Sequence, residues 1–293
     1  MQATMEKQQN PLMTLRNQQP LPKLNRENYY DLATESYMSF SLYKRFKKCE
    51  AEAMAYLNGE IPKIEETNAA LLMGNYLHTY FESGEAHASF IEENQKELIS
   101  SRGKSKGSLK SNYVLADKMI KALNQQELFK GVYQGKKEVI LTGELFGMSW
   151  KVRIDCLHVP GDESDVAYFC DLKTSKNLHA KFWNNDLHEW QPFVTAYNYD
   201  LQMAVYQEII RQNYGMTFAP FIFGVSKEDV PEVVGIEFKQ VELDEPLSAL
   251  EADMPHIIRL LNGEEEPLSC GRCDYCKAHN QLIGFVDIDS LLD

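Results

Sequence analysis

The sequence predicts an α/β fold with a mixed central sheet flanked by helices. The first observation behind this prediction is the order of its elements: helices, three strands, a helix, two strands and a final helix. This order is typical of a sheet covered by helices. The second is periodicity, because apolar residues recur at helical spacing in some segments and short β-branched and aromatic runs between turn formers fill others.

Length and local composition suggest how the chain is divided. At 293 residues it can form one large domain, or a domain with an appendage. Residues 1–27 are rich in Gln, Asn and Pro without a sustained apolar period, so we expect a flexible N-terminal arm. We expect one folded domain over residues 28–280, which includes a cysteine cluster at 270–276, and an acidic tail over 281–293.

The first half of the chain predicts mostly helices. One helix should begin after Ser39 and end before Gly59, where a glycine and a proline follow the apolar pattern. Another should begin near Thr67 and end near Gly84. Further helices are expected at 86–99 and 112–129, separated by an exposed basic loop over 100–111.

The second half predicts the sheet. Residues 139–173 contain three strand-like runs separated by turn formers at Gly147 and Pro160, which indicates an antiparallel meander. The aromatic segment 179–190 is expected to be a short helix or a lid. A helix should follow from Pro192 to about residue 213, because proline is tolerated in a first turn. Strands at 218–225 and 233–241 and a helix at 246–261 complete the pattern.

Bulk properties narrow the class of protein. The formal net charge of −13 opposes nucleic-acid binding, since phosphates attract cations. Basic residues nevertheless cluster at 44–48 and 102–110, and acidic ones at 264–266 and 287–293. This distribution is compatible with DNA binding in a local basic groove, and equally compatible with a protein that binds no DNA. No apolar run is long enough to span a membrane, and no secretory signal is visible. Six cysteines without a signal indicate reduced thiols or metal ligands in a cytoplasm.

Two aspartates end neighbouring predicted strands. Asp171 and Lys173 are two residues apart, so they share one face of a strand, and Asp155 on the adjacent strand can lie beside them. Two close carboxylates repel unless a cation lies between them, and oxygen ligands suit Mg²⁺ or Mn²⁺. A nearby ammonium can stabilise charge as a phosphate is attacked. The alternative is that each residue is an ordinary polar group at a strand end.

Two predicted helices carry further candidates. Gly74 lies one turn before His78, which leaves room beside the imidazole for a ligand or another backbone segment. Gln202 and Tyr206 also lie one turn apart and share a face. The alternatives are a structural histidine and an amphipathic helix with two polar residues at its boundary.

The cysteine cluster has metal-ligand spacing. Cys270, Cys273 and Cys276 form a C-x₂-C-x₂-C run beside a glycine turn, which favours a soft metal ion. A fourth ligand is needed. His279 would give a closed zinc site, whereas Cys49 would give a four-thiolate site for zinc or an iron–sulfur cluster. Unliganded thiols are the alternative.

In this order, the motifs resemble those of the PD-(D/E)XK nuclease superfamily, and within it the RecB-like branch with the phage RecE-type (exonuclease VIII) exonucleases. The branch's G-x₃-H motif matches Gly74 and His78, its metal aspartate Asp155, its D-x-K motif Asp171 and Lys173, and its Q-x₃-Y motif Gln202 and Tyr206. The resemblance covers about residues 36–280. It implies a restriction-endonuclease-like fold.

The resemblance also implies roles for these residues. His78, Asp155 and Asp171 would bind Mg²⁺, with the Leu172 carbonyl as a further ligand. Lys173 would position or activate the attacking water, and Gln202 and Tyr206 would orient DNA or support the site. Glu82 and Glu144 are weaker candidates for a second metal or a water. An early cysteine and three late ones, here Cys49 with Cys270, Cys273 and Cys276, resemble the iron–sulfur pattern of other nucleases of the branch.

The function implied is a phage or prophage double-stranded DNA exonuclease that resects ends and delivers single strands to an annealing recombinase in the bacterial host cytosol. RecE-like relatives form rings, so a homo-oligomer is expected. One alternative is an iron–sulfur single-strand nuclease or nickase of the same fold. Another is a non-catalytic DNA-binding or assembly module in which the acidic residues are structural.

Overall fold

The computed structural model describes residues 21–31, 36–61, 69–162, 165–185, 187–281, 284–285 and 287–288. Most of the predicted N-terminal arm and of the predicted acidic tail lie outside these residues. The chain divides into two compact units. The larger unit comprises Leu24–Tyr29 and Ile64–Met254, and the smaller comprises Met1–Lys23, Tyr30–Lys63 and Pro255–Asp293.

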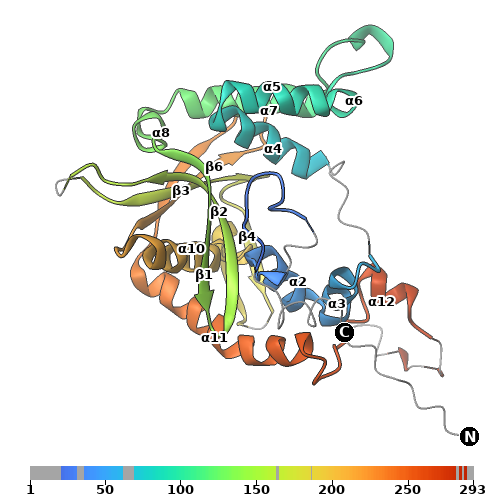
Figure 1. Ribbon diagram of the computed structural model, residues 1–293. Coiled ribbons are helices and arrows are strands. Elements are labelled where there is room, and N and C mark those ends of the chain that lie inside the picture. The colour runs from blue at the N-terminus through green and yellow to red at the C-terminus, as the bar shows by residue number, and fades with distance from the viewer. Residues whose placement is uncertain are drawn as a thin grey trace, which may run out of the picture. The chain divides into compact units, whose positions relative to one another are not determined.

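A mixed five-stranded sheet is the centre of the larger unit, as the element order predicted (Figure 1). Its strand order is β1-β2-β3-β6-β7. Strands β3 and β6 are parallel, and the other neighbours are antiparallel. The bounds are β1 Lys136–Leu145, β2 Met148–His158, β3 Tyr168–Ser175, β6 Ala219–Ser226 and β7 Val233–Glu237.

A tight turn fixes the register of the first hairpin. Phe146 and Gly147 both have positive φ, 50° and 83°, which matches the right-handed twist of the strands they join. Leu145 therefore pairs directly with Met148, and the pairing continues to Lys136 and Leu157. The three-strand meander predicted from residues 139–173 is confirmed.

The crossover from β3 to β6 differs from the prediction. Residues 179–190, expected as a short helix or lid, form a separate two-stranded sheet of β4 Lys181–Asn184 and β5 Glu189–Pro192. Facing aromatic side chains on the two strands favour this hairpin. The helix expected from Pro192 is also interrupted: α9 Phe193–Ala196 and α10 Tyr199–Tyr214 are separated by Asn198, whose φ is 56°.

Helices cover one face of the sheet with an apolar layer (Figure 1). They are α4 Ala69–Glu82, α5 Gly84–Glu93, α6 Gln95–Leu98, α7 Ser111–Asn124 and α8 Glu127–Val132. The shared core includes Leu77, Met119 and Leu123 from the helices and Leu172 and Val225 from the sheet. The helices predicted at 86–99 and 112–129 are thus each divided in two, and the intervening basic loop contains a short 3₁₀ turn, η2 Gly103–Ser105.

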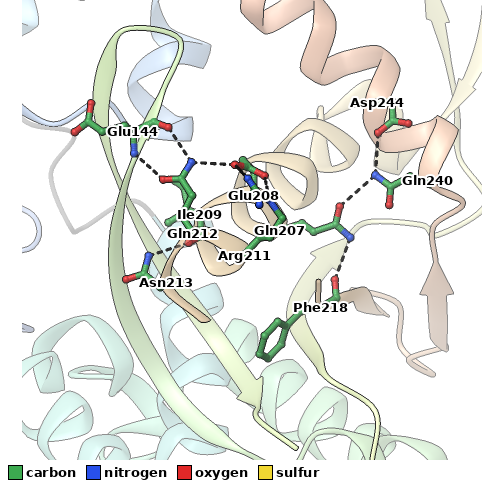
Figure 2. A network of polar contacts seen from close by, with 10 residues as sticks. All are labelled: Glu144, Gln207, Glu208, Ile209, Arg211, Gln212, Asn213, Phe218, Gln240 and Asp244. Atoms are coloured by element: carbon green, nitrogen blue, oxygen red, sulfur yellow. Dashed lines mark hydrogen bonds and ion pairs between the residues drawn. The ribbon is translucent and has the colours of Figure 1, made fainter. Parts of the chain in front are cut away.

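Helix α10 packs against β1, β2 and β6. A polar network fixes its C-terminal half to β1 (Figure 2). Gln212 Oε1 accepts from the Glu144 amide at 2.9 Å, and its Nε2 donates to the Glu144 carbonyl at 2.9 Å. Asn213 Nδ2 donates to the Thr142 carbonyl at 2.9 Å. These bonds hold the helix in a defined position against the strand.

The smaller unit contains α2 Phe40–Lys48, α3 Glu50–Leu57 and α12 Asp274–Ala278. Helix α11, Gln240–Leu261, begins in the larger unit and ends in the smaller one, and it starts earlier than the predicted residue 246. The single helix predicted between Ser39 and Gly59 is wrong, because Cys49 has an extended backbone (φ −167°, ψ 113°) between α2 and α3. Among the described residues, the helices are all too short or too polar to cross a membrane.

Candidate active site

Strands β2 and β3 separate at the two predicted aspartates. Their ladder runs from His158 and Tyr168 to Cys156 and Cys170 and ends there, so the next residues along each strand, Asp155 and Asp171, lie where the strands diverge. Asp155 Oδ2 accepts a hydrogen bond from the Leu172 amide at 2.8 Å. An aspartate side chain therefore replaces the lost ladder bond, which fixes its carboxylate between the strands.

Helix α4 brings a histidine to this fork. His78 Nδ1 lies 3.3 Å from Asp155 Oδ2. One turn earlier, a Cβ added at Gly74 would meet no atom within 4 Å. The glycine therefore leaves open space beside the imidazole turn, as its spacing predicted.

The carboxylate of Asp171 is held from two sides. Lys173 Nζ lies 2.6 Å from Asp171 Oδ2, and Gln202 Nε2 of α10 donates to Asp171 Oδ1 at 3.2 Å. The ring of Tyr199 lies under the lysine, 4.6 Å from its Nζ. Tyr206, one turn after Gln202, is buried, and its ring lies 6.5 Å from that of Phe169.

The structure adds one acid that the sequence reasoning missed. Glu138 of β1 lies between Lys137 and Val139, which pair with Cys156 and Ile154 on either side of Asp155, and the ladder is interrupted at Glu138 itself. Its side chain is only 6% exposed, and its φ is 55°. Arg153 forms an ion pair with its carboxylate. Three possible ligand atoms, one from each of His78, Glu138 and Asp155, lie within 4.8 Å of one another. This spacing suits a shared metal ion.

Electrostatics favour positive charge at this point. Burial would lower the pKa of His78, but Asp155, with Glu138 and Asp171, raises it to about 9. Burial raises the pKa of Glu138 to about 7, and Asp155 adds to this rise while Arg153 opposes it. These carboxylates are costly to keep charged and close together, so a cation between them lowers the electrostatic free energy.

Asp171 and Lys173 have opposing perturbations. Burial raises the pKa of Asp171 to about 6 although Lys173 lowers it. Burial would lower the pKa of Lys173, but Asp171 and Asp155 raise it above its usual value, so the ammonium stays charged. Apart from this ion pair, the buried Asp171 Oδ2 has no hydrogen-bond donor among the described residues. Two acids, an imidazole and this under-coordinated oxygen fit a hard divalent cation.

The remaining predicted residues have other positions. The amide of Leu172 is bound to Asp155, while the role of its carbonyl as a ligand stays a prediction. Glu82 forms an ion pair with Arg26. Residues 24–27, the end of the expected arm, belong to the larger unit, which includes Leu24–Tyr29. Glu144 lies near the turn of the β1–β2 hairpin, where its backbone amide donates to Gln212 (Figure 2). Its side chain accepts a hydrogen bond from Ser149. It is not a member of the acidic cluster.

The four predicted cysteines lie together in the smaller unit. The Sγ atom of Cys49 is 3.4 Å from that of Cys276, and those of Cys270 and Cys276 are 3.9 Å apart. All four sulfurs, including that of Cys273, lie within 4.8 Å of one another. His279 instead is exposed, with Nδ1 2.8 Å from the Tyr275 carbonyl oxygen. Cys49 therefore supplies the fourth sulfur.

Local backbone geometry points the thiols inward. Gly271 has a φ of 69°, which a glycine adopts without strain. The Cys273 amide donates to Cys270 Sγ at 3.3 Å, and the Cys276 amide donates to Cys273 Sγ at 3.4 Å. The side chain of Ser269 helps to lower the pKa of Cys276 to about 6. Amide donors stabilise thiolates, which are the form that binds metal. The pKa of Cys276 is lowered, whereas those of Cys49 and Cys273 are raised in the absence of a metal.

Comparison with known proteins places this geometry in a family. Residues 39–279 match the model of a PDDEXK-like domain of unknown function (DUF3799). A comparison with curated proteins gave no match. The crystal structure of a "putative exonuclease" from Eubacterium rectale is 36% identical, with a TM-score of 0.82, over 92% of this chain and 98% of that one. The structure of SSO0001, at 13% identity and a TM-score of 0.28, is too different to support any inference. Because the family match spans both the strand fork and the cysteines, the chain belongs to the PDDEXK-like family, as its ordered motifs predicted.

Proposed function

We propose that the chain is a Mg²⁺-dependent deoxyribonuclease that hydrolyses phosphodiester bonds at the β2–β3 fork. The observation that carries this proposal is the meeting of His78, Asp155, Asp171 and Lys173 from three elements at one point, with Glu138 close to Asp155. The similarity to a structure described as an exonuclease supports the same activity.

Each side chain has a role in this proposal. His78, Glu138 and Asp155 hold the divalent cation, and Asp171 contributes its Oδ2 atom, with the Leu172 carbonyl as an expected further ligand. A bound Mg²⁺ would polarise the phosphate and lower the pKa of a coordinated water. Lys173, kept charged by Asp171, orients the attacking water and stabilises negative charge that develops on the phosphate. Gln202 keeps Asp171 in position, and buried Tyr206 supports that part of α10.

We further propose that the substrate is a double-stranded DNA end, which a ring-forming homo-oligomer resects for a single-strand-annealing recombinase of phage type. This part of the proposal depends on the motif resemblance, while the related crystal structure, described as a "putative exonuclease", supports only the exonuclease activity.

Digestion of linear duplex DNA tests the activity. Wild type should release nucleotides with Mg²⁺ and none with EDTA, while Lys173→Ala should lose at least about a hundredfold in rate, as removal of one group that stabilises transition-state charge does in other enzymes. Lys136→Ala is the matched control, because Lys136 is exposed at the start of β1. Equal digestion by wild type and Lys173→Ala would refute the proposed mechanism. Closed circular duplex, which has no ends, distinguishes an exonuclease from an endonuclease or nickase.

For the cysteines, we propose a single structural zinc ion. A tetrahedral zinc with Zn–S bonds of about 2.3 Å separates its sulfurs by about 3.8 Å. The Cys49–Cys276 and Cys270–Cys276 sulfur separations, 3.4 and 3.9 Å, are close to this value. An iron–sulfur cluster, which contains several metal atoms, holds its cysteine sulfurs farther apart. It remains the second candidate because four thiolates also ligate such clusters.

A further inference from the structure

Two tryptophans lie exposed on the β4–β5 hairpin of the larger unit. Trp183 is 47% exposed and Trp190 63% exposed. They pair directly across the two strands, with ring centroids 5.3 Å apart and an interplanar angle of 67°. Large aromatic side chains gathered on a surface are unfavourable in water unless a partner covers them. Their position therefore indicates a binding surface.

The other face of the hairpin leads to the proposed active site. Successive residues of a strand point to opposite faces, so Phe182 lies on the face away from the tryptophans. Its ring centroid is 5.3 Å from that of Tyr197, which is 5.8 Å from that of Tyr199. Lys173 Nζ lies over the ring of Tyr199 at 4.6 Å. A continuous row of rings thus connects one face of the ribbon to the catalytic lysine.

Both ends of the hairpin are fixed to the sheet. A Cβ added at Gly224 of β6 would lie 3.1 Å from Leu178 Cδ2 and 3.4 Å from Phe193 Cζ. These two residues precede β4 and follow β5, and both are buried. The glycine therefore lets the two connections pack closely on β6, which holds the ribbon in place.

Two cations follow the parallel strands β3 and β6, at the end of β3 from which the chain continues to the hairpin. Lys176 follows Ser175 of β3, and Lys227 follows Ser226 of the neighbouring parallel strand β6. The Lys227 amide donates to the Ser175 carbonyl at 2.7 Å. Burial lowers the pKa of Lys227, and the charge of Lys176 lowers it further. Two neighbouring like charges favour a nearby anion, such as a phosphate of a nucleic-acid backbone, while Glu228 and Glu232, which contact Asn177 and His179, add negative charge in the same region.

We propose that Trp183 and Trp190 are a stacking platform for unpaired DNA bases at a duplex end. Exposed aromatic rings beside cations are the combination by which proteins bind single strands without reading sequence. Since the opposite face of the ribbon leads to Lys173, the hairpin separates the strand being hydrolysed from the strand stacked on the tryptophans. This inference rests on the proposed nuclease function and adds the surface that holds the uncut strand.

Binding of single-stranded DNA tests the platform without catalysis. The chain has three tryptophans, and the third, Trp150, is fully buried. Titration with an unlabelled thymidine oligonucleotide in EDTA should therefore quench the two exposed tryptophans and leave a residual emission from Trp150. No quenching at saturating binding, measured in parallel by anisotropy of a labelled oligonucleotide, would overturn the proposal.

Substitutions separate stacking from general apolar contact. The double variant Trp183→Leu/Trp190→Leu should bind the labelled oligonucleotide at least fivefold more weakly, and up to about 150-fold for each lost stack, given about 1–3 kcal/mol per stacked base and 1.4 kcal/mol per tenfold. Trp183→Phe/Trp190→Phe keeps aromatic rings and should bind within about threefold of wild type. Leu128→Ala, which truncates an equally exposed apolar side chain at 65% exposure, is the matched control. Equal affinity of the leucine and phenylalanine variants would contradict stacking.

The same variants keep this proposal distinct from the proposed function. If wild type digests duplex DNA while the leucine variant digests it with an unchanged KM and binds single strands normally, the platform is wrong and the nuclease stands. If wild type digests nothing but the tryptophans are quenched by DNA, the platform stands and the nuclease fails. A leucine variant with a smaller assembly mass by light scattering and unchanged DNA binding would assign the surface to contact between copies of the chain, which overturns the platform.

Discussion

The position of Glu138 is unfavourable for a glutamate in an ordinary sheet. It lies at an interruption of the β1–β2 ladder, with a carboxylate oxygen within 4.8 Å of one of Asp155, so the two like charges repel each other. Its backbone has positive φ, which costs a residue with a Cβ about 1 kcal/mol or more. Arg153 and His78 offset part of the repulsion. A residue that is unfavourable both in backbone and in charge is more easily explained by a ligand than by packing.

The Glu138→Gln variant tests this interpretation. A neutral amide is a weaker ligand, so the stabilisation by Mn²⁺ in thermal denaturation, which reaches about 2.7 kcal/mol at a hundred times Kd in wild type, should decrease strongly. The Mg²⁺ concentration required for half-maximal DNA cleavage should increase at least about tenfold. Glu144→Gln on the same strand is the control, because Glu144 is bound to Gln212 and Ser149 outside the cluster. A metal response equal in both variants would exclude Glu138 as a ligand.

Gln202 is a positioning residue, because it contacts Asp171 and not the reacting atoms. Loss of its hydrogen bond in Gln202→Ala should decrease metal affinity or activity about 10- to 100-fold. Gln202→Glu should decrease metal affinity or activity more than Gln202→Ala does, because it places a second carboxylate about 3.2 Å from Asp171 Oδ1. The Mg²⁺ dependence of DNA cleavage by the two variants measures which substitution has the larger effect. If the glutamate variant were as active as wild type, the hydrogen bond would have no positioning role.

At the scale of elements, the strands and their order were predictable because alternation and turn formers are local signals. The turn at Phe146 and Gly147 also indicates where Glu138 lies, because a two-residue hairpin loop sets the register in which the neighbours of Glu138 pair on either side of Asp155. The hairpin over Lys181–Pro192 was not predictable in the same way. Its strands have four residues each, too few to distinguish alternation from helical spacing.

The break at Cys49 shows a second limit. Helical periodicity continues through it, and the sequence alone gives no sign of an extended residue. In the structure the Cys49 thiol lies beside cysteines more than 200 positions away. The backbone that follows also contacts this distant segment, because the Ala51 amide donates to the Leu268 carbonyl at 3.1 Å. Contacts distant in sequence therefore override local helix propensity here.

The attachment of α10 to β1 carries a stability prediction. Gln212 makes two hydrogen bonds to the backbone of Glu144, and a Cβ at Gly143 would lie 2.6 Å from Gln212 Oε1. Gln212→Ala should lower the free energy of unfolding by about 1–2 kcal/mol, because a net hydrogen bond contributes about 1 kcal/mol. Gly143→Ala should have a similar cost by displacing the same side chain. Urea denaturation measures both, and Arg211→Ala, which removes a same-helix pair with Glu208, should change stability by less than about 0.5 kcal/mol.

The end of α11 carries a pH prediction. His256 lies between Glu50 at 2.9 Å and Glu265 at 2.5 Å, and these carboxylates raise its pKa. Protonated His256 thus stabilises the folded state fully below its unfolded pKa of about 6.5, and this contribution is lost as pH rises through the raised folded pKa. The wild-type unfolding free energy should therefore decrease relative to that of His256→Gln as pH rises above about 6.5. Parallel pH profiles for the two proteins would contradict the contribution of His256.

At the scale of the whole molecule, net charge and local charge have different consequences. Acidic residues exceed basic ones by 43 to 30, which opposes non-specific binding to polyanions. The proposed DNA contacts depend instead on a few cations, Lys173, Lys176 and Lys227, and on the exposed rings of Trp183 and Trp190. A protein that relies on stacking more than on phosphate contacts should show weak salt dependence, because each phosphate contact adds about 0.7 to the log–log slope for single strands.

The cysteine cluster links segments at both ends of the chain, so its metal should contribute to the stability of the smaller unit. Cys49 comes from the α2–α3 junction and the other three from residues 270–276, and hydrogen bonds of Glu50 and Ala51 to Leu268 join the same two segments. Removing one thiolate leaves an open coordination position. Cys276→Ser should therefore bind less than one zinc per chain and unfold at a lower temperature than wild type, with added zinc restoring little of the loss.

Elemental analysis and visible absorbance decide the identity of the metal. We expect one zinc and no iron per chain in wild-type protein purified without oxygen, and no absorbance near 400 nm. Cys170→Ser is the matched control for metal content, because Cys170 is a buried cysteine of β3 outside the four-sulfur group, so its zinc should be unchanged. Iron in the protein together with absorbance near 400 nm would mean that the cysteines hold an iron–sulfur cluster and not zinc. Metal-free wild-type protein with the stability of Cys276→Ser would mean that the four thiols are only packed together.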